Sequence, residues 1–310
     1  MFKRLIVPLD GSKLAEIALP YAEEIARHLG SEVILVNVRT SVEKLDKPEY
    51  REYLSRMAAV TEQNIKKSAD KPVGEKVKVA SAVIGEPSLL QHPAEHIVNY
   101  AVKENASLII MATHGRTGIS HWALGSTAEK VVRICKCPVM LIRAGARPVT
   151  SVHFENIMVP LDGSKEGEAS LAYIENFASS IKAKIKLMNI VEMPYRFLAA
   201  PTPVGYYSGE GLIRVPYNAE ELKPIKAAAA KYIESVSAKL TAAGIKNTSE
   251  VRIGSPGEEI VEAEEESHPD LLVMSSHGQS GFGRFDFGSV AEKVLHKGTA
   301  PILMVRPKQK

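Results

Sequence analysis

Cysteine, aromatic residues and long apolar runs are all scarce in this chain. Only Cys135 and Cys137 occur among 310 residues, so the sequence holds no disulfide framework of the kind found in small secreted proteins. No apolar run reaches the roughly 20 residues that a membrane-spanning helix needs, and the segment after Met1 carries no apolar signal region. These absences favour a cytoplasmic protein with no membrane partner.

The chain also has little excess of charge of either sign. The formal net charge is +3 and the charged residues are spread along the chain, so the sequence has no basic stripe for a nucleic acid. Apolar residues make up 45% and charged residues 24%, which is typical of a soluble globular protein. The length is sufficient for two domains of ordinary size, each with its own core.

Several catalytic and cofactor motifs are absent as well. The chain has no Gly-Lys-Ser/Thr phosphate loop, no Gly-x-Ser-x-Gly nucleophile elbow and no dinucleotide fingerprint. Cys135 and Cys137 have no companion cysteine or histidine pair, so we expect no zinc site, and Cys137 is most simply a small buried residue. No evident nucleophile or base indicates rapid catalysis, and we assign no catalytic residue.

An internal repeat organises the chain. The hexapeptide Val-Pro-Leu-Asp-Gly-Ser at 7–12 recurs identically at 159–164, and the later matches keep the same order. These matches pair 85–87 with 254–256, 113–115 with 276–278, 125–131 with 288–294, and 137–141 with 300–304. The repeat predicts two domains, 1–146 and 152–310, joined by a Gly- and Pro-containing linker.

Short apolar runs alternate with helical patterns within each half. In the first half we expect strands at 5–9, 33–38, 76–83, 108–111 and 139–143, and helices at about 14–29, 50–68, 88–104 and 120–134. Pro20 is expected to kink the first helix, and Gly30 to end it. Continuous apolar strands separated by helices indicate a parallel sheet covered on both faces. The predicted fold class is therefore α/β, with two tandem doubly wound five-stranded domains.

The two halves differ most at 193–217. This segment holds Pro194, Pro201, Pro203 and Pro216 beside four tyrosines, and it is longer than an ordinary connection between a strand and a helix. Two interpretations remain open. The segment is a surface loop that merely varies, or it is a lid over a second site or a contact to the other domain.

Polar residues follow the first predicted strand of each half, where open α/β sheets bind their ligands. Asp10 stands at the end of the first strand, and Asp162 holds the same place in the second half. Either carboxylate could accept hydrogen bonds from a ribose or a base. The alternative is that Asp-Gly-Ser only forms a turn and caps the next helix.

A second set of small and polar residues follows the fourth predicted strand. His114, Gly115 and Arg116 come directly after it, and Gly125 and Ser126 stand near the opening of a helix. Glycines let the backbone approach phosphate oxygens, and a helix N-terminus offers free amide groups. The same arrangement recurs in the second half, which makes a phosphate site a stronger hypothesis than one glycine pattern would.

On these motifs the chain resembles a tandem universal stress protein over essentially its whole length. The ATP-binding members of that family carry Gly, two residues, Gly, nine residues, then Gly-Ser/Thr. The matching positions here are Ala112, Gly115, Gly125 and Ser126 in the first half, and Ser275, Gly278, Gly288 and Ser289 in the second. Both copies keep the spacing, and both replace the first glycine by a small residue.

The resemblance implies an adenine-nucleotide site in each half, on a fold like that of the adenine-nucleotide alpha-hydrolases. Asp10 and Asp162 would hold the adenosine, while Val38 and Ile190 would offer backbone to adenine. ATP is the expected ligand, with AMP and ADP left open, and Mg²⁺ could accompany it. The expected binding residues are Pro8, Asp10, Val38, Met111, Ala112, His114, Gly115, Arg116, Gly125, Ser126 and Thr127, then Pro160, Asp162, Ile190, Met274, Ser275, Gly278, Gly288, Ser289 and Val290.

The two expected sites are not equal. Arg116 follows the glycine of the first half, where the second half has the neutral Gln279, and Asp286 stands where the first half has Ala123. A carboxylate near a polyphosphate is repulsive unless a divalent ion lies between them. We therefore expect the first half to be the better ATP site, and Asp286 to be a solvated residue or part of a metal-assisted second site.

Three functions remain in view. The leading hypothesis is a stress-response protein in which ATP acts as a conformational switch, with at most slow hydrolysis or autophosphorylation. The second is a nucleotide-free interaction module with degenerate pockets, which Ala112 and Ser275 would favour. The third is an ATP-dependent enzyme whose second substrate is held by 193–217.

Because the last strand of this family commonly pairs domains, we expect the two halves to pair within one chain, and a further homodimer is left open.

Overall fold

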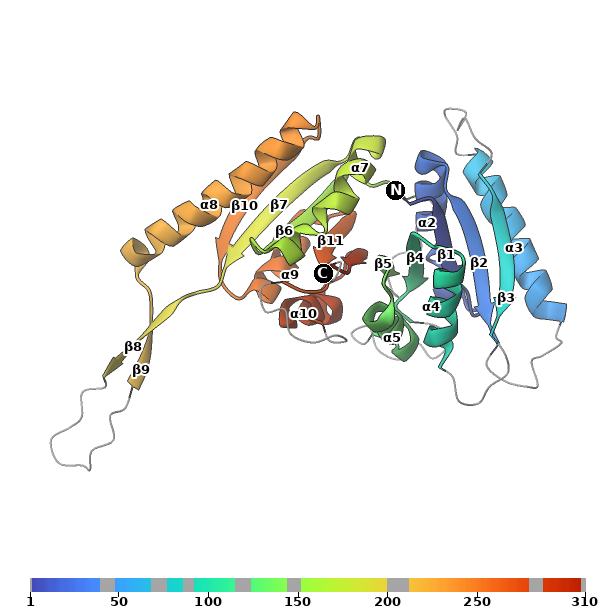
Figure 1. Ribbon diagram of the computed structural model, residues 1–310, viewed down its shortest axis with the longest axis horizontal. Coiled ribbons are helices and arrows are strands. Elements are labelled where there is room, and N and C mark those ends of the chain that lie inside the picture. Colours follow the sequence, from blue (N-terminus) through green and yellow to red (C-terminus); the bar gives the residue numbers. More distant parts are fainter. Residues whose placement is uncertain are drawn as a thin grey trace, which may run out of the picture.

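The computed structural model describes residues 2–39, 48–67, 77–85, 92–114, 124–143, 152–199, 212–278 and 287–307. Within them a single ten-stranded sheet runs through both halves of the chain, in the order β10-β7-β6-β11-β12-β5-β4-β1-β2-β3 (Figure 1). The strands of the first half are β1 (Arg4–Pro8), β2 (Glu32–Val38), β3 (Val79–Ile84), β4 (Leu108–Ala112) and β5 (Val139–Ile142). Those of the second half are β6 (Asn156–Leu161), β7 (Lys184–Val191), β10 (Asn247–Ile253), β11 (Leu271–Ser275) and β12 (Ile302–Val305).

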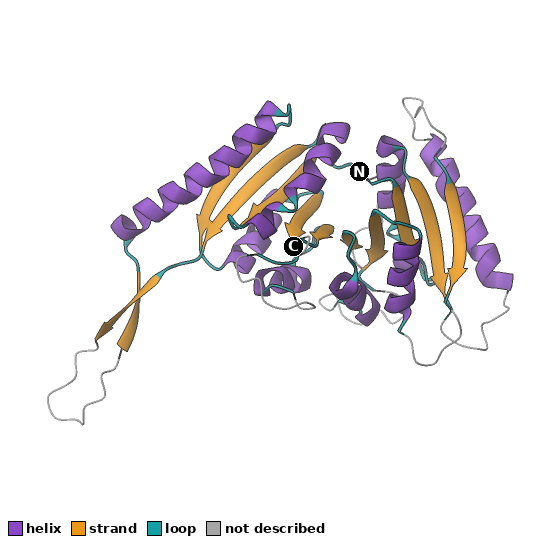
Figure 2. Cartoon of the chain, in the orientation of Figure 1, coloured by secondary structure: helices purple, strands orange, loops and turns teal. Residues whose placement is uncertain are grey.

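Helices cover both faces of this sheet (Figure 2). In the first half they are α1 (Lys13–Glu16), α2 (Leu19–Leu29), α3 (Pro48–Lys67), α4 (Pro93–Lys103) and α5 (Ser126–Ile134). In the second they are α6 (Lys165–Glu168), α7 (Leu171–Ile181), α8 (Ala219–Ala242), α9 (Pro256–Ser267) and α10 (Ser289–Lys297). One buried cluster joins the sheet to α2, α3, α7 and α8, and a second joins its other face to α4, α5, α9 and α10. The predicted α/β class with two doubly wound five-stranded halves is confirmed.

Pro20 does not kink a long helix, so that expectation was wrong. The chain forms two helices here: Ser12 caps the start of the short α1 by accepting a hydrogen bond from the Ala15 amide, α1 ends at Glu16, and α2 begins at Leu19. Pro20 therefore lies in the first turn of α2, where its missing N–H group would have had no helical partner. Gly30 ends α2 in the left-handed conformation, as predicted.

The two halves meet where β5 pairs with β12, as the family resemblance implied, and the structure shows that this pairing is antiparallel. Within each half every pairing among these strands is parallel. Aromatic rings pack across the same seam: Phe2 lies against Phe177 of α7 with ring centroids 5.8 Å apart, and Tyr21 of α2 lies 6.1 Å from Phe154. The seam thus hides two sheet edges that would otherwise be open to solvent.

Two arginines cap helices across this seam. Arg143, directly after β5, donates to the carbonyls of Leu295 and Val294 in the last turn of α10, at 2.5 and 2.8 Å. Arg306, directly after β12, donates to the carbonyl of Cys135 at the end of α5, at 3.4 Å. A cation at a helix C-terminus satisfies open carbonyls and complements the helix dipole, so each half stabilises a helix of the other.

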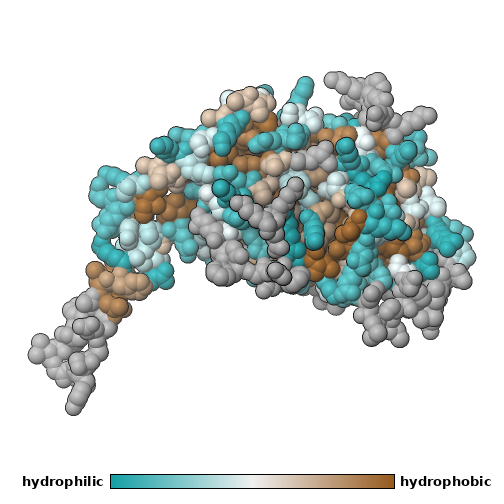
Figure 3. All heavy atoms as spheres, viewed as in Figure 1, coloured by the Kyte–Doolittle hydropathy of each residue, from teal (hydrophilic) through white to brown (hydrophobic). Residues whose placement is uncertain are grey.

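The segment 193–217 forms a protruding hairpin in its described part. β8 (Tyr195–Ala199) pairs antiparallel with β9 (Leu212–Pro216), and the pair extends away from both halves (Figure 1). Phe197 and Leu212 are 65% and 64% exposed, and apolar surface is visible on this arm (Figure 3). The described part is therefore neither a lid over the second site nor a contact to the first domain, and 200–211 lie outside the described residues.

None of the described helices is both long and apolar enough to cross a membrane.

Arg143→Ala should lower the free energy of unfolding by about 2–3 kcal/mol, because two charge-assisted hydrogen bonds to buried carbonyls are lost. The measurement is the urea midpoint with its slope. Lys66→Ala is the control, since Lys66 forms only an exposed ion pair with Glu62 and should cost less than about 0.5 kcal/mol. Equal effects of the two changes would contradict the capping role.

Candidate functional site

The strand order reverses once within each half. β1 lies between β2 and β4, and β6 lies between β7 and β11, so the chain leaves β1 and β4, or β6 and β11, toward opposite faces of the sheet. A crevice forms at the carboxyl ends of such strands, and ligands of open α/β sheets bind there. Asp10 and His114 follow the first pair of strands, and Asp162 and His277 follow the second.

Asp10 and Asp162 each organise a turn at this edge. The Ser12 amide donates to Asp10 Oδ1 at 2.9 Å, and the Ser164 amide donates to Asp162 Oδ1 at 3.0 Å. Each serine then caps the following short helix. The turn-and-cap role weighed from the sequence is therefore present, and it also fixes where each carboxylate lies.

In the second half the structure brings Asp162 and Gly278 together. A Cβ atom added to Gly278 would lie 2.1 Å from Asp162 Oδ2, so a side chain there requires the carboxylate to move. The loop after β11 and the turn after β6 therefore adjoin across the crevice. In the first half Gly115 and Arg116 lie outside the described residues, as do Gln279 and Asp286 of the second half.

Two asparagines that sequence reasoning missed hold these turns in place. Asn37 Nδ2 donates to the Leu9 carbonyl at 2.7 Å, and Asn189 Nδ2 donates to the Leu161 carbonyl at 2.8 Å. Both asparagines are buried within otherwise apolar strands. Their recurrence at matched positions of β2 and β7 was the signal, because a buried amide needs a specific hydrogen-bond partner.

Two tyrosines beside the aspartates were missed as well. Tyr53 Oη donates to Glu16 Oε1 at 3.2 Å, and Tyr232 Oη donates to Glu168 Oε1 at 3.0 Å. Burial and then the neighbouring glutamate raise the pKa of each phenol. Both phenols therefore stay protonated and act as donors. The glutamates recur six residues after Asp10 and Asp162, which was the available signal.

A histidine follows each of β4 and β11, and each ring has a buried nitrogen. His114 Nδ1 contacts Thr113 Oγ1 at 3.2 Å, and His277 Nδ1 contacts Ser276 Oγ at 2.9 Å. In both rings Nε2 is buried and has no hydrogen-bond partner among the described residues. Burial, and then Arg143, lowers the pKa of His114, so this ring is neutral at neutral pH. A buried polar atom without a partner indicates a place for a ligand or a water.

The helices that follow begin at glycines with uncapped N-termini. The Gly125 amide donates to the Thr113 carbonyl at 2.9 Å, and the Gly288 amide donates to the Ser276 carbonyl at 3.0 Å. Neither N-cap glycine has a side chain to cap the first turn, so among the described residues no N-cap side chain covers the first amides of α5 and α10. Free amides at the positive end of a helix dipole are suited to an anion.

The remaining predicted residues also lie at this edge of the sheet, but their side chains differ in how far they are buried. The side chains of Met111 and Met274 are each only 5% exposed and pack in the core, so only their backbone can face a ligand. Ala112 and Ser275 are the last residues of β4 and β11 and are also buried. The others lie at strand ends or helix starts: Pro8, Pro160, Val38, Ile190, Ser126, Thr127, Ser289 and Val290.

The family model described as the universal stress protein family matches residues 1–143 and again 153–306. The chain belongs to the universal stress protein family. A universal stress protein of Methanocaldococcus jannaschii is 30% identical over 143 residues, which are 46% of this chain and 83% of that protein.

Solved structures support the two-half architecture of this universal stress protein chain. A universal stress protein from Archaeoglobus fulgidus matches at TM-score 0.66 and 18% identity, covering 99% of both chains. A chain from Pseudomonas aeruginosa assigned to the same family matches at TM-score 0.68 and 17% identity, covering 99% of this chain and 94% of that one. At these identities the likeness establishes the shared fold.

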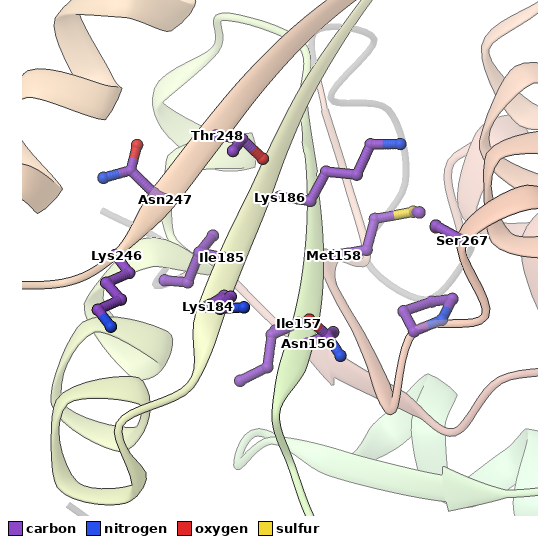
Figure 4. Close-up of a pocket in the computed structure, with 11 residues that line it drawn as sticks. Asn156, Ile157, Met158, Lys184, Ile185, Lys186, Lys246, Asn247, Thr248 and Ser267 are labelled. Carbon is purple, nitrogen blue, oxygen red and sulfur yellow. The ribbon is translucent and has the colours of Figure 1, made fainter.

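A separate cavity lies at the opposite ends of the strands of the second universal stress protein half. Its volume is about 280 Å³, and it is lined by the first residues of β6, β7 and β10, including Lys184, Lys186 and Asn247 (Figure 4). Lys186 is paired with Glu250 at 2.8 Å. None of the predicted binding residues lines this cavity.

The two N-cap glycines predict a matched pair of substitutions. A Cβ at Gly125 would lie 2.8 Å from the Thr113 carbonyl oxygen, whereas a Cβ at Gly288 would lie 3.6 Å from the Ser276 oxygen. Gly125→Ala should therefore cost about 1–3 kcal/mol, because backbone must shift. Gly288→Ala should change stability by less than about 0.5 kcal/mol. Urea unfolding measures both, and a Gly288→Ala cost as large as that of Gly125→Ala would contradict the packing described.

Proposed function

We propose that this universal stress protein binds an adenine nucleotide, ATP with Mg²⁺ in the leading case, in the crevice of each half. The observation that carries the proposal is the pair of uncapped helix N-termini, at Ser126 and Ser289, each held by a glycine against the end of the neighbouring strand. Such a helix start offers amides and positive dipole character to phosphate oxygens.

The other groups of each crevice suit the rest of the nucleotide. Asp10 and Asp162 offer carboxylate oxygens to ribose hydroxyls, and the buried Nε2 atoms of His114 and His277 can each take a further hydrogen bond. Ala112 and Ser275, the last residues of β4 and β11, have small side chains. The first half is the stronger proposed site, because Arg116 follows its glycine and the second half carries Asp286.

In this proposal the nucleotide acts as a switch in the cytoplasm and not as the substrate of rapid turnover. The helix that receives the phosphates in the first half, α5, ends at the seam, where Arg306 donates to the Cys135 carbonyl. A ligand at its start therefore acts on a helix whose other end contacts the second half. Any hydrolysis would be slow, and no residue is assigned to it.

Ser126→Asp and Ser289→Asp test the two sites separately. Both serines are exposed, and an acidic residue in the first turn of a helix favours the folded state, so each variant should fold. The new carboxylate should repel the phosphates and weaken ATP binding at its own site by about 100-fold. Calorimetric titration of nucleotide-stripped protein with ATP, AMP and GTP in the presence of Mg²⁺ measures the effect.

Ser235→Asp is the matched control for that titration. It adds the same charge on an exposed face of α8 and should leave ATP affinity unchanged. If the double variant Ser126→Asp with Ser289→Asp still binds ATP as the wild type does, the sites are elsewhere. If the folded wild type binds no nucleotide, the chain is an interaction module and the proposal is wrong.

A further inference from the structure

Two thiols lie in contact at the seam between the halves. Cys135 ends α5 with extended backbone, the chain bends at 136 and 137, and β5 begins at Val139. The Sγ atoms of Cys135 and Cys137 are 3.3 Å apart, and both cysteines are free thiols. The spacing of two residues did not by itself indicate this contact.

The sulfur positions suit a bond between the two side chains. The S–S bond of a disulfide is about 2.0 Å long. Since the sulfurs already lie 3.3 Å apart, a bond needs them to approach by only about 1 Å.

The surroundings favour a reactive pair over two inert thiols. The contact between the two sulfurs lowers the pKa of Cys135, and the Arg306 cation lowers it further. The same contact and burial raise the pKa of Cys137. A thiolate is the nucleophilic form of cysteine, and a nearby cation stabilises it. Cys135 is 2% exposed, whereas Cys137 is only partly buried, so solvent reaches the pair at Cys137.

We propose that Cys135 and Cys137 are a reversible dithiol–disulfide site at the seam, oxidised by hydroperoxides. Cys135 loses its thiol proton to solvent, and the resulting thiolate attacks a peroxide oxygen. The O–O bond breaks, the leaving oxygen takes up a proton from solvent, and Cys135 becomes a sulfenic acid. The Cys137 sulfur then attacks the Cys135 sulfur as the S–O bond breaks, and the Cys137 proton leaves with the departing hydroxide as water.

In this step the dithiol loses two electrons and two protons in net terms, and the peroxide is reduced to water and an alcohol, or to two waters when it is hydrogen peroxide. A dithiol such as dithiothreitol reverses the bond by thiol–disulfide exchange.

The position of this site connects it to both halves. The Cys135 carbonyl accepts the hydrogen bond from Arg306, which follows β12 of the second half. α5 runs from Ser126 to Ile134, directly before Cys135. Disulfide formation therefore acts on the last turn of α5 and on its contact with the second half.

Intact-mass measurement of the full chain after treatment with hydrogen peroxide tests the proposal. Because the chain holds only two cysteines, the loss of two hydrogen atoms per monomer identifies this bond without further mapping. We expect that loss in the folded wild type, reversed by dithiothreitol, and absent from Cys135→Ser and Cys137→Ser. Wild-type thiol loss should also be about tenfold faster than that of either variant, because each variant lacks the neighbouring sulfur.

A second measurement keeps the proposal open to refutation if a serine variant fails to fold. Phenylarsine oxide bridges two neighbouring thiols, so reduced wild-type protein should gain one arsenical per chain and oxidised protein none. An unchanged mass after peroxide, gain of oxygen atoms without loss of the two hydrogens, disulfide-linked dimers, or no arsenical uptake by the reduced protein would each overturn the site.

Discussion

The direction and order of the strands in each half are the constraint on which the candidate sites depend. Parallel strands bring all their carboxyl ends to one edge of the sheet, and the chain departs from β1 and β4 toward opposite faces. The Asp10 turn follows β1, and His114 and the Gly125 that precedes α5 follow β4, at this edge of the sheet. The second half repeats the arrangement with Asp162, His277 and α10. No single side chain creates this site, because the strand order determines which side chains can meet.

A second constraint is the antiparallel pairing of β5 with β12, which makes one sheet of two halves. Arg143 and Arg306 cap helices of the opposite half, so the ends of α5 and α10 contribute to the seam while their starts contribute to the crevices. Each of these helices is only nine residues long, so a single short helix reaches from the edge of the crevice to the seam in each half. The proposed phosphate site and the Cys135–Cys137 pair therefore lie at opposite ends of the same helix, α5.

Much of this arrangement could be predicted from the sequence, because the motifs that indicate it are short and occur once in each half. The repeated hexapeptide, the continuous apolar strands and the recurring glycines predicted the fold and the strand edge, and the family resemblance implied the pairing of the two halves through their last strands. Pro20 was placed wrongly because helical periodicity continues across 17–18 and does not reveal that Ser12 caps a separate short helix. The hairpin could not be predicted, because its apolar side chains, such as Phe197, are exposed. Asn37 and Tyr53 act through tertiary contacts that one strand or helix pattern does not contain.

The claim that nucleotide phosphates bind at the starts of α5 and α10 is tested most directly by following backbone amide resonances during addition of ATP with Mg²⁺. The account predicts that the amide resonances of Ser126, Thr127, Ser289 and Val290 shift most. Their shifts should grow with the fraction of protein that has bound ATP and stop when the sites are saturated. Unmoved resonances at both helix starts, with shifts confined to the lysine-lined cavity at Lys184 and Lys186, would contradict it.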